Sequence, residues 1–148
     1  MGSLSLPSSG TVYMDANCII YSVERIEPYR TLLEPLWLAS GPTTFWLASS
    51  ELTLLEALVG PLKTGDARLE TNFRTILQHS SDVQLIPITL PILERAAQLR
   101  AATSLKTPDA IHAATALEHG CTLFVTNDTA FRRVPGLPVT TLADLLMP

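Results

Sequence analysis

The chain has 148 residues, of which 47% are hydrophobic and 16% charged, so it can form the core of one domain and does not belong to the disordered or coiled-coil classes. No apolar run reaches the roughly 18 residues that a transmembrane helix needs. The formal net charge of −4 does not by itself favour nucleic-acid binding, so such a function would depend on where the acidic residues lie.

The N-terminal segment MGSLSLPSSG lacks both a basic stretch and a sustained apolar core, which argues against a secretory signal. We expect residues 1–10 to be a flexible lead-in and residues 11–148 to form a single domain. Cys18 and Cys121 have no CxxC spacing, which disfavours a zinc ribbon or a redox pair. Both are expected to be buried thiols in a reducing cytoplasm.

From residue 11 onward, runs of β-branched and aromatic residues alternate with segments of helical periodicity. The expected strands span residues 11–15, 43–49, 83–88, 121–128 and 137–142. The expected helical segments span residues 16–27, 28–41, 49–60, 66–80, 90–103 and 107–119. The third is expected to begin near Ser49 and stop at Gly60-Pro61, and the last to have Thr107 as its N-cap. Apolar strands that alternate with helices predict a parallel sheet covered on both faces, in a three-layer α/β/α domain.

Four acidic residues lie at positions that this fold can bring together. Asp15 and Asp128 end two strands, Asp109 lies in the first turn of the helix before the fourth strand, and Glu56 lies on the helix after the second strand. Ligands of open parallel sheets bind beyond the carboxyl ends of the strands, where the strand order reverses. Each acid also has an ordinary explanation: a cap for Asp15, a turn for Asp128, a helix-dipole partner for Asp109 and a rim-exposed side chain for Glu56.

The segments VYMDANCIIY, SSELTLLEAL, TPDAIHAATA and FVTNDTAF resemble, in this order, the successive acidic motifs of the PIN domain family. Within it, they are most similar to the VapC-type toxins of bacterial toxin–antitoxin pairs. The resemblance extends from about residue 11 to residue 141. It implies a five-stranded sheet of order 3-2-1-4-5, in which the first and fourth strands are neighbours.

The resemblance also implies a site, a substrate and partners. The implied catalytic and metal-binding residues are Asp15, Glu56, Asp109 and Asp128, with Asn17 and Thr126 in support. The implied substrate is RNA, cut to leave 3′-hydroxyl and 5′-phosphate ends. The implied partners are a VapB-like antitoxin, bound in an apolar groove, and a second copy of the chain in a homodimer. The helical segments over residues 17–40 and 66–80, with Leu36, Trp37 and Leu38, are candidates for these contacts.

A metal is also expected on electrostatic grounds. Two carboxylates about 4 Å apart repel by about 4 kcal/mol at an effective dielectric constant near 20, so a cluster of four needs protonation, separation or a cation. Oxygen donors select hard cations, which predicts Mg²⁺ or Mn²⁺. Such an ion can activate water for hydrolysis of a phosphodiester. Arg132, Arg133 and Lys106 are candidate RNA contacts.

Other functions remain open at this stage. The chain could be a PIN-like RNA-processing nuclease without an antitoxin, or a non-catalytic scaffold that binds RNA or protein. Paired imidazoles among His79, His112 and His119 could cleave RNA without a metal, although no pairing is suggested by their spacing. A phosphoacceptor receiver domain is disfavoured, because no acidic pair follows the first strand and no lysine follows the last.

Overall fold

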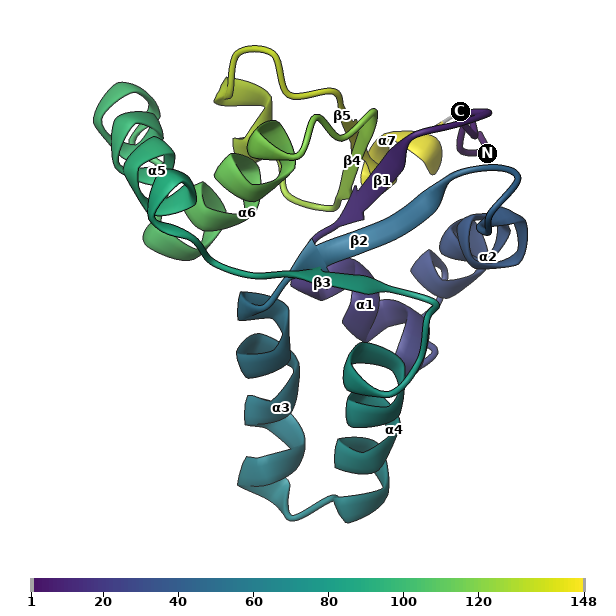
Figure 1. Cartoon of the computed structure of the whole chain (residues 1–148). Coiled ribbons are helices and arrows are strands. Elements are labelled where there is room, and N and C mark those ends of the chain that lie inside the picture. Colours follow the sequence, from purple (N-terminus) through teal and green to yellow (C-terminus); the bar gives the residue numbers. More distant parts are fainter. Residues whose placement is uncertain (1, 148) are drawn as a thin grey trace.

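A single parallel sheet forms the centre of the computed structural model, which describes residues 2–147 (Figure 1). Its strands are β1 (Thr11–Met14), β2 (Trp46–Ser50), β3 (Gln84–Ile86), β4 (Leu123–Thr126) and β5 (Val139–Thr141). They lie in the order β3-β2-β1-β4-β5, and every neighbouring pair is parallel. The predicted order 3-2-1-4-5 is therefore confirmed, and β1 and β4 are neighbours in the middle of the sheet.

Helices connect the strands and cover both faces of the sheet (Figure 1). They are α1 (Ala16–Val23), α2 (Tyr29–Ala39), α3 (Leu52–Thr64), α4 (Ala67–Gln78), α5 (Leu90–Thr103), α6 (Thr107–Glu118), the 3-10 helix η1 (Thr129–Arg133) and α7 (Leu142–Leu145). Helices α3 and α4 pack side by side and project together from the rest of the molecule. No helix within residues 2–147 is long and apolar enough to cross a membrane.

Side chains of the central strands point alternately into two separate cores, because successive residues of a β-strand face opposite sides of the sheet. Val12 and Met14 of β1 pack in one core with buried residues of α1, α2 and α4. Tyr13, between them, packs in the other core with buried residues of α5 and α6. The same division separates Val125 from Phe124 in β4. The predicted three-layer α/β/α architecture is thus confirmed.

Several predicted helix boundaries were wrong. Helix α3 begins at Leu52, with Glu51 as its N-cap, because Ser49, near which it was expected to begin, still belongs to β2. Helix α3 does not stop at Gly60-Pro61 but runs on to Thr64 and ends at Gly65, which has a φ of 72°. Pro61 has no amide hydrogen to donate within the helix, yet it is buried, so its packing offsets the lost hydrogen bond. The N-cap of α6 is Lys106 rather than Thr107, which is already the first helical residue.

The N-terminal segment contacts the C-terminal helix. The Gly2 amide donates a hydrogen bond to the Leu145 carbonyl at 2.6 Å, and Leu4 belongs to the same core as α1 and α2. The expected flexibility of residues 1–10 and the limits of the domain remain predictions. Cys18 and Cys121 are both free and buried.

Candidate active site

Asp15 lies at the carboxyl end of β1, where it is almost fully buried. Its Oδ1 accepts a hydrogen bond from the Cys18 amide at 3.1 Å, so it caps α1. Its Oδ2 accepts a hydrogen bond from the Thr126 hydroxyl at 2.5 Å. Both oxygens are therefore fixed by neighbouring elements. Burial raises the pKa of the Asp15 carboxyl, although these hydrogen bonds oppose the shift.

Thr126 joins the ends of the two central strands. Besides donating to Asp15, its Oγ1 accepts a hydrogen bond from the Asp128 amide at 3.0 Å. The Asp128 side chain is exposed, and its Oδ1 accepts the Ala130 amide at 2.8 Å at the start of η1. The parallel pairing of β1 with β4 thus places the chain segments of Asp15 and Asp128 beside one another.

Asp109 and Asp128 share a small open pocket of about 260 Å³ beyond the strand ends. Lys106 and Arg133 line the same pocket. Burial is the main cause that raises the pKa of Asp109, and the negative charge of Asp128 is the next. The charges of Asp15 and Glu56 raise this pKa further, whereas His112 lowers it only when its imidazole is protonated. The other three acids predicted from the sequence therefore lie close enough to influence the pKa of Asp109, and we call Asp15, Glu56, Asp109 and Asp128 the acidic cluster.

Glu56 is tied to a residue whose role the sequence left open. Its Oε1 lies 2.6 Å from Nε2 of His112, and Nδ1 of His112 lies 2.6 Å from the hydroxyl of Tyr13. His112 is only 2% exposed, whereas the Glu56 side chain is 30% exposed. The spacing of three residues from Asp109 to His112 was the available signal, since it puts both on one face of a helix. Nothing in the sequence pointed to Tyr13.

The remaining predicted residues lie at the surface. Asn17 is exposed in the first turn of α1, and in the described part of the chain no hydrogen bond joins it to the acidic cluster. Arg132 forms an ion pair with Asp144, which partly neutralises its positive charge. Arg133 donates to the Thr103 carbonyl at 3.4 Å and stays exposed.

The donors of the acidic cluster suit a hard divalent cation. All of them are carboxylate oxygens, and the nearby Cys18 thiol is engaged with the Val125 carbonyl. Across residues 2–147, no three His, Cys, Asp or Glu side chains lie close enough to hold one ion as they stand. The repulsion that raises the pKa of Asp109 is nevertheless the strain that a cation would relieve.

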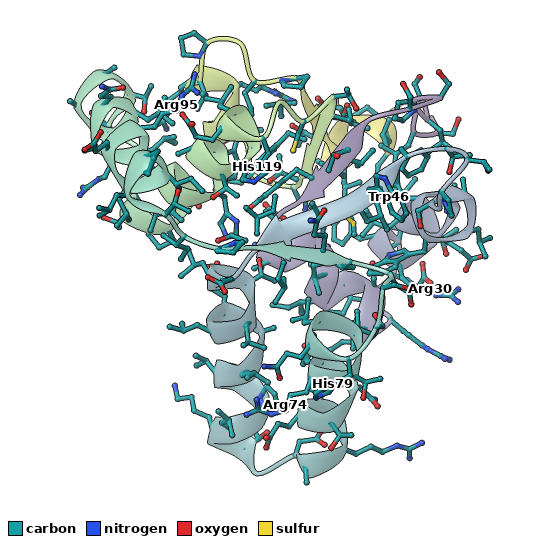
Figure 2. The ribbon with its side chains drawn as sticks, in the orientation of Figure 1. Arg30, Trp46, Arg74, His79, Arg95 and His119 are labelled. Carbon is teal, nitrogen blue, oxygen red and sulfur yellow. The ribbon has the colours of Figure 1, made fainter. Side chains whose placement is uncertain are left out.

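The histidines do not form the pair that metal-free cleavage would require. His79 and His119 follow the ends of α4 and α6 and lie far apart in Figure 2. Both ring nitrogens of His112 are engaged, one with Tyr13 and one with Glu56. The arrangement therefore supports chemistry by carboxylates rather than by two imidazoles.

We expect Asp15→Asn to raise the melting temperature of the metal-free protein at pH 7. Burial raises the pKa of the Asp15 carboxyl above its ordinary 3.8. Ionising this carboxyl is therefore less favourable in the folded protein than in the unfolded chain, which lowers the free energy of unfolding. This cost is absent below the ordinary pKa and grows as pH rises through the folded-state pKa. Asparagine caps a helix about as well as aspartate does, so the cap of α1 is retained.

The measurement is the melting temperature in EDTA at pH 4 and at pH 7. The advantage of Asp15→Asn should be present at pH 7 and shrink at pH 4. Asp82→Asn is the matched control, since Asp82 is exposed, and it should show no such difference. A lower melting temperature for Asp15→Asn at pH 7 would mean that the ionised carboxylate stabilises the fold.

Comparison with known proteins finds one family model that matches the chain and several solved structures with a similar fold. A model of the PIN domain family matches residues 12–137. A toxin–antitoxin complex from Klebsiella pneumoniae contains a chain with a TM-score of 0.65 at 29% identity, covering 88% of this chain and 96% of that one. A search of curated proteins finds no significant match.

Two further solved structures share the fold at lower identity. VapBC2 from Rickettsia felis, bound to a DNA fragment from its promoter, gives a TM-score of 0.68 at 21% identity, covering 88% of this chain and 98% of that one. VapC20 of Mycobacterium tuberculosis, a toxin that cleaves the sarcin–ricin loop, gives 0.68 at 16% identity, covering 82% and 92%. The sheet and its helices are therefore arranged as in these proteins.

Proposed function

The chain belongs to the PIN domain family, and on this basis we propose that it is an endoribonuclease that hydrolyses RNA phosphodiester bonds with Mg²⁺ or Mn²⁺. The observation that carries the proposal is the acidic cluster, in which Asp109 and Asp128 line one pocket and Thr126 links Asp128 to Asp15. The charges of the other three members all raise the pKa of Asp109. A cluster of like charges in a cleft at the strand ends weakens the fold, so a functional reason for it is favoured.

The residues that would hold the ion are Asp15, Glu56, Asp109 and Asp128. Asp15 is rigid because hydrogen bonds fix both of its oxygens. Asp109 and Asp128 are partly or fully exposed at the pocket, so their side chains can adjust when an ion and substrate arrive. A bound divalent ion supplies positive charge that acidifies water and stabilises the charge that develops on the phosphodiester.

The chain's own residues supply the rest of the chemistry. A carboxylate of the acidic cluster orients the attacking water and accepts its proton. Lys106 and Arg133 line the pocket beside Asp109 and attract the phosphates of the RNA. Arg132 contributes less, because Asp144 already neutralises part of its charge. The basic residues around the pocket thus offset the net charge of −4 where the substrate would bind.

We also propose that the protein is the toxin of a VapBC-type pair and binds a VapB-like antitoxin. A toxin–antitoxin complex is the assembly in which the Klebsiella pneumoniae relative was solved. Between α1, α2 and α4 lies a cleft of about 430 Å³ whose apolar lining includes Val23, Trp37, Leu38 and Ile76. Leu38 is 78% exposed in it, while Leu36, the other leucine expected there, is fully buried in the core. This cleft is our candidate for the antitoxin groove.

We also propose that the protein forms a homodimer and is located in the cytoplasm. A homodimer would bury apolar side chains that are exposed along α3, namely Leu55, Val59 and Leu62. They follow one another at helical spacing and so form a stripe on one side of the helix. We place the protein in the cytoplasm, where the thiols of Cys18 and Cys121 stay reduced.

Metal dependence is the test of the proposed activity. The purified protein, incubated with a pool of transfer, ribosomal and messenger RNA, is expected to cut in Mg²⁺ or Mn²⁺ and to lose detectable cutting in EDTA. Fresh Mn²⁺ added in excess of EDTA should restore it, and the fragments should carry 5′-phosphate ends that a ligation assay detects. Cutting that continues in EDTA would contradict the mechanism. Absence of both cutting and Mn²⁺ binding would favour the non-catalytic scaffold.

A further inference from the structure

A buried chain of hydrogen bonds connects the core with the acidic cluster. It begins at Tyr13 on β1, passes through His112 on α6 and ends at Glu56 on α3, with 2.6 Å at each step. Tyr13 is fully buried, and its ring stacks on Phe124 with the centroids 5.0 Å apart. The hydroxyl of Tyr13 is therefore held in place by the sheet.

The roles of the donors and acceptors follow from the end of the chain at Glu56. An ionised glutamate only accepts hydrogen bonds, so Nε2 of His112 must carry the hydrogen that it donates to Oε1. A neutral imidazole has a single N–H, which leaves Nδ1 as an acceptor. The hydroxyl of Tyr13 then donates to Nδ1. In this arrangement the hydroxyl of Tyr13 and both ring nitrogens of His112 are satisfied without a second buried charge.

We propose that His112 is a positioning residue that holds Glu56 in the acidic cluster, and that Tyr13 fixes the tautomer of His112 required for this. The inference rests on the proposed function, in which Glu56 serves the metal site. With Oε1 held by His112, Oε2 is the oxygen that Glu56 offers to an ion or to its water. Without His112, Glu56 has three rotatable bonds and a partly exposed side chain, so its carboxylate would not be held in one place.

Four variants test this proposal. His112→Leu replaces the imidazole with an apolar side chain of similar size and so removes both hydrogen bonds. His112→Gln is the conservative variant, because its amide can still donate to Glu56 and accept from Tyr13. Tyr13→Phe removes only the hydroxyl. His119→Leu is the matched control, since His119 is exposed and is the C-cap of the same helix, α6.

Three readouts are needed: the Mn²⁺ dissociation constant from the electron paramagnetic resonance of free Mn²⁺, kcat and KM on a cut RNA, and the nitrogen chemical shifts of the imidazole. We expect His112→Leu to weaken Mn²⁺ binding about 10- to 100-fold and to lower kcat with little change in KM. His112→Gln should recover most of both losses, and Tyr13→Phe should cause a smaller loss. His119→Leu should match the wild type. The spectrum of the wild type should show hydrogen on Nε2 of His112.

The outcomes separate this proposal from the proposed function. If the wild type binds Mn²⁺ and cuts RNA while His112→Leu and Tyr13→Phe behave like it, the positioning role is wrong and the nuclease stands. If the wild type neither binds Mn²⁺ nor cuts, the proposed function fails and the positioning role fails with it. Hydrogen found on Nδ1 would overturn the role of Tyr13. Should circular dichroism show that His112→Leu is unfolded, the His112→Gln and Tyr13→Phe variants decide the question.

Discussion

Asp15→Asn and Asp109→Asn, made separately, are each expected to lower the rate of RNA cleavage by about 100- to 1,000-fold, as when an enzyme loses one strong electrostatic contact to its transition state. Both substitutions keep the size of the side chain and remove its charge. Asp15 is buried against Cys18 and Thr126, and Asp109 lines the pocket. Initial rates on one purified RNA at saturating Mn²⁺ give the effect.

Controls decide whether the loss comes from the site or from the fold. Asp82→Asn, at an exposed position outside the acidic cluster, should cut like the wild type. The melting temperatures of the Asp15→Asn and Asp109→Asn variants show whether they remain folded, and Asp15→Asn should be more stable than the metal-free wild type at pH 7. A variant that stays folded and still cuts at the normal rate would show that its carboxylate is not part of the reaction.

Phe124→Ala should destabilise the fold by about 3–5 kcal/mol, a large part of the roughly 5–15 kcal/mol that holds an ordinary domain together. Phe124 is fully buried in β4 and lies between Tyr13, with ring centroids 5.0 Å apart, and Phe131, at 4.7 Å. The substitution removes these contacts and leaves a cavity beside the central strand. Urea denaturation followed by tryptophan fluorescence gives the free energy of unfolding.

Leu90→Ala is the control for this loss of apolar side-chain volume, because Leu90 is 74% exposed and should change stability by less than about 0.5 kcal/mol. If Phe124→Ala leaves too little folded protein to measure, Phe124→Leu, which keeps part of the volume, should cost about 1–2 kcal/mol. Equal stabilities of Phe124→Leu and the wild type would mean that the aromatic stack between the sheet and η1 contributes little.

Much of the fold could be predicted because its signals are local. Helix α5 begins at Leu90 and ends at Thr103, as expected from the sequence, and the structure adds that Thr89 caps its first turn. The inner strands β1, β2 and β4 are mostly buried on both faces, so their apolar composition indicated a covered parallel sheet. The boundary of α3 was missed for the opposite reason. Gly60 and Pro61 favour a helix end in isolation, and only packing against α4 makes it favourable to continue the helix to Thr64.

The sequence by itself determined which acids stand at the ends of strands and in first turns, since strand and helix limits depend on neighbouring residues. Together with the position of Glu56 on the helix after the second strand, this indicated Asp15, Glu56, Asp109 and Asp128 as one group. Only the tertiary structure decided how Glu56 is held. His112 is 56 residues from Glu56 in the sequence and 99 residues from Tyr13, so no local pattern can encode these contacts. The chain of hydrogen bonds exists because the sheet order places β1, α3 and α6 around one buried space.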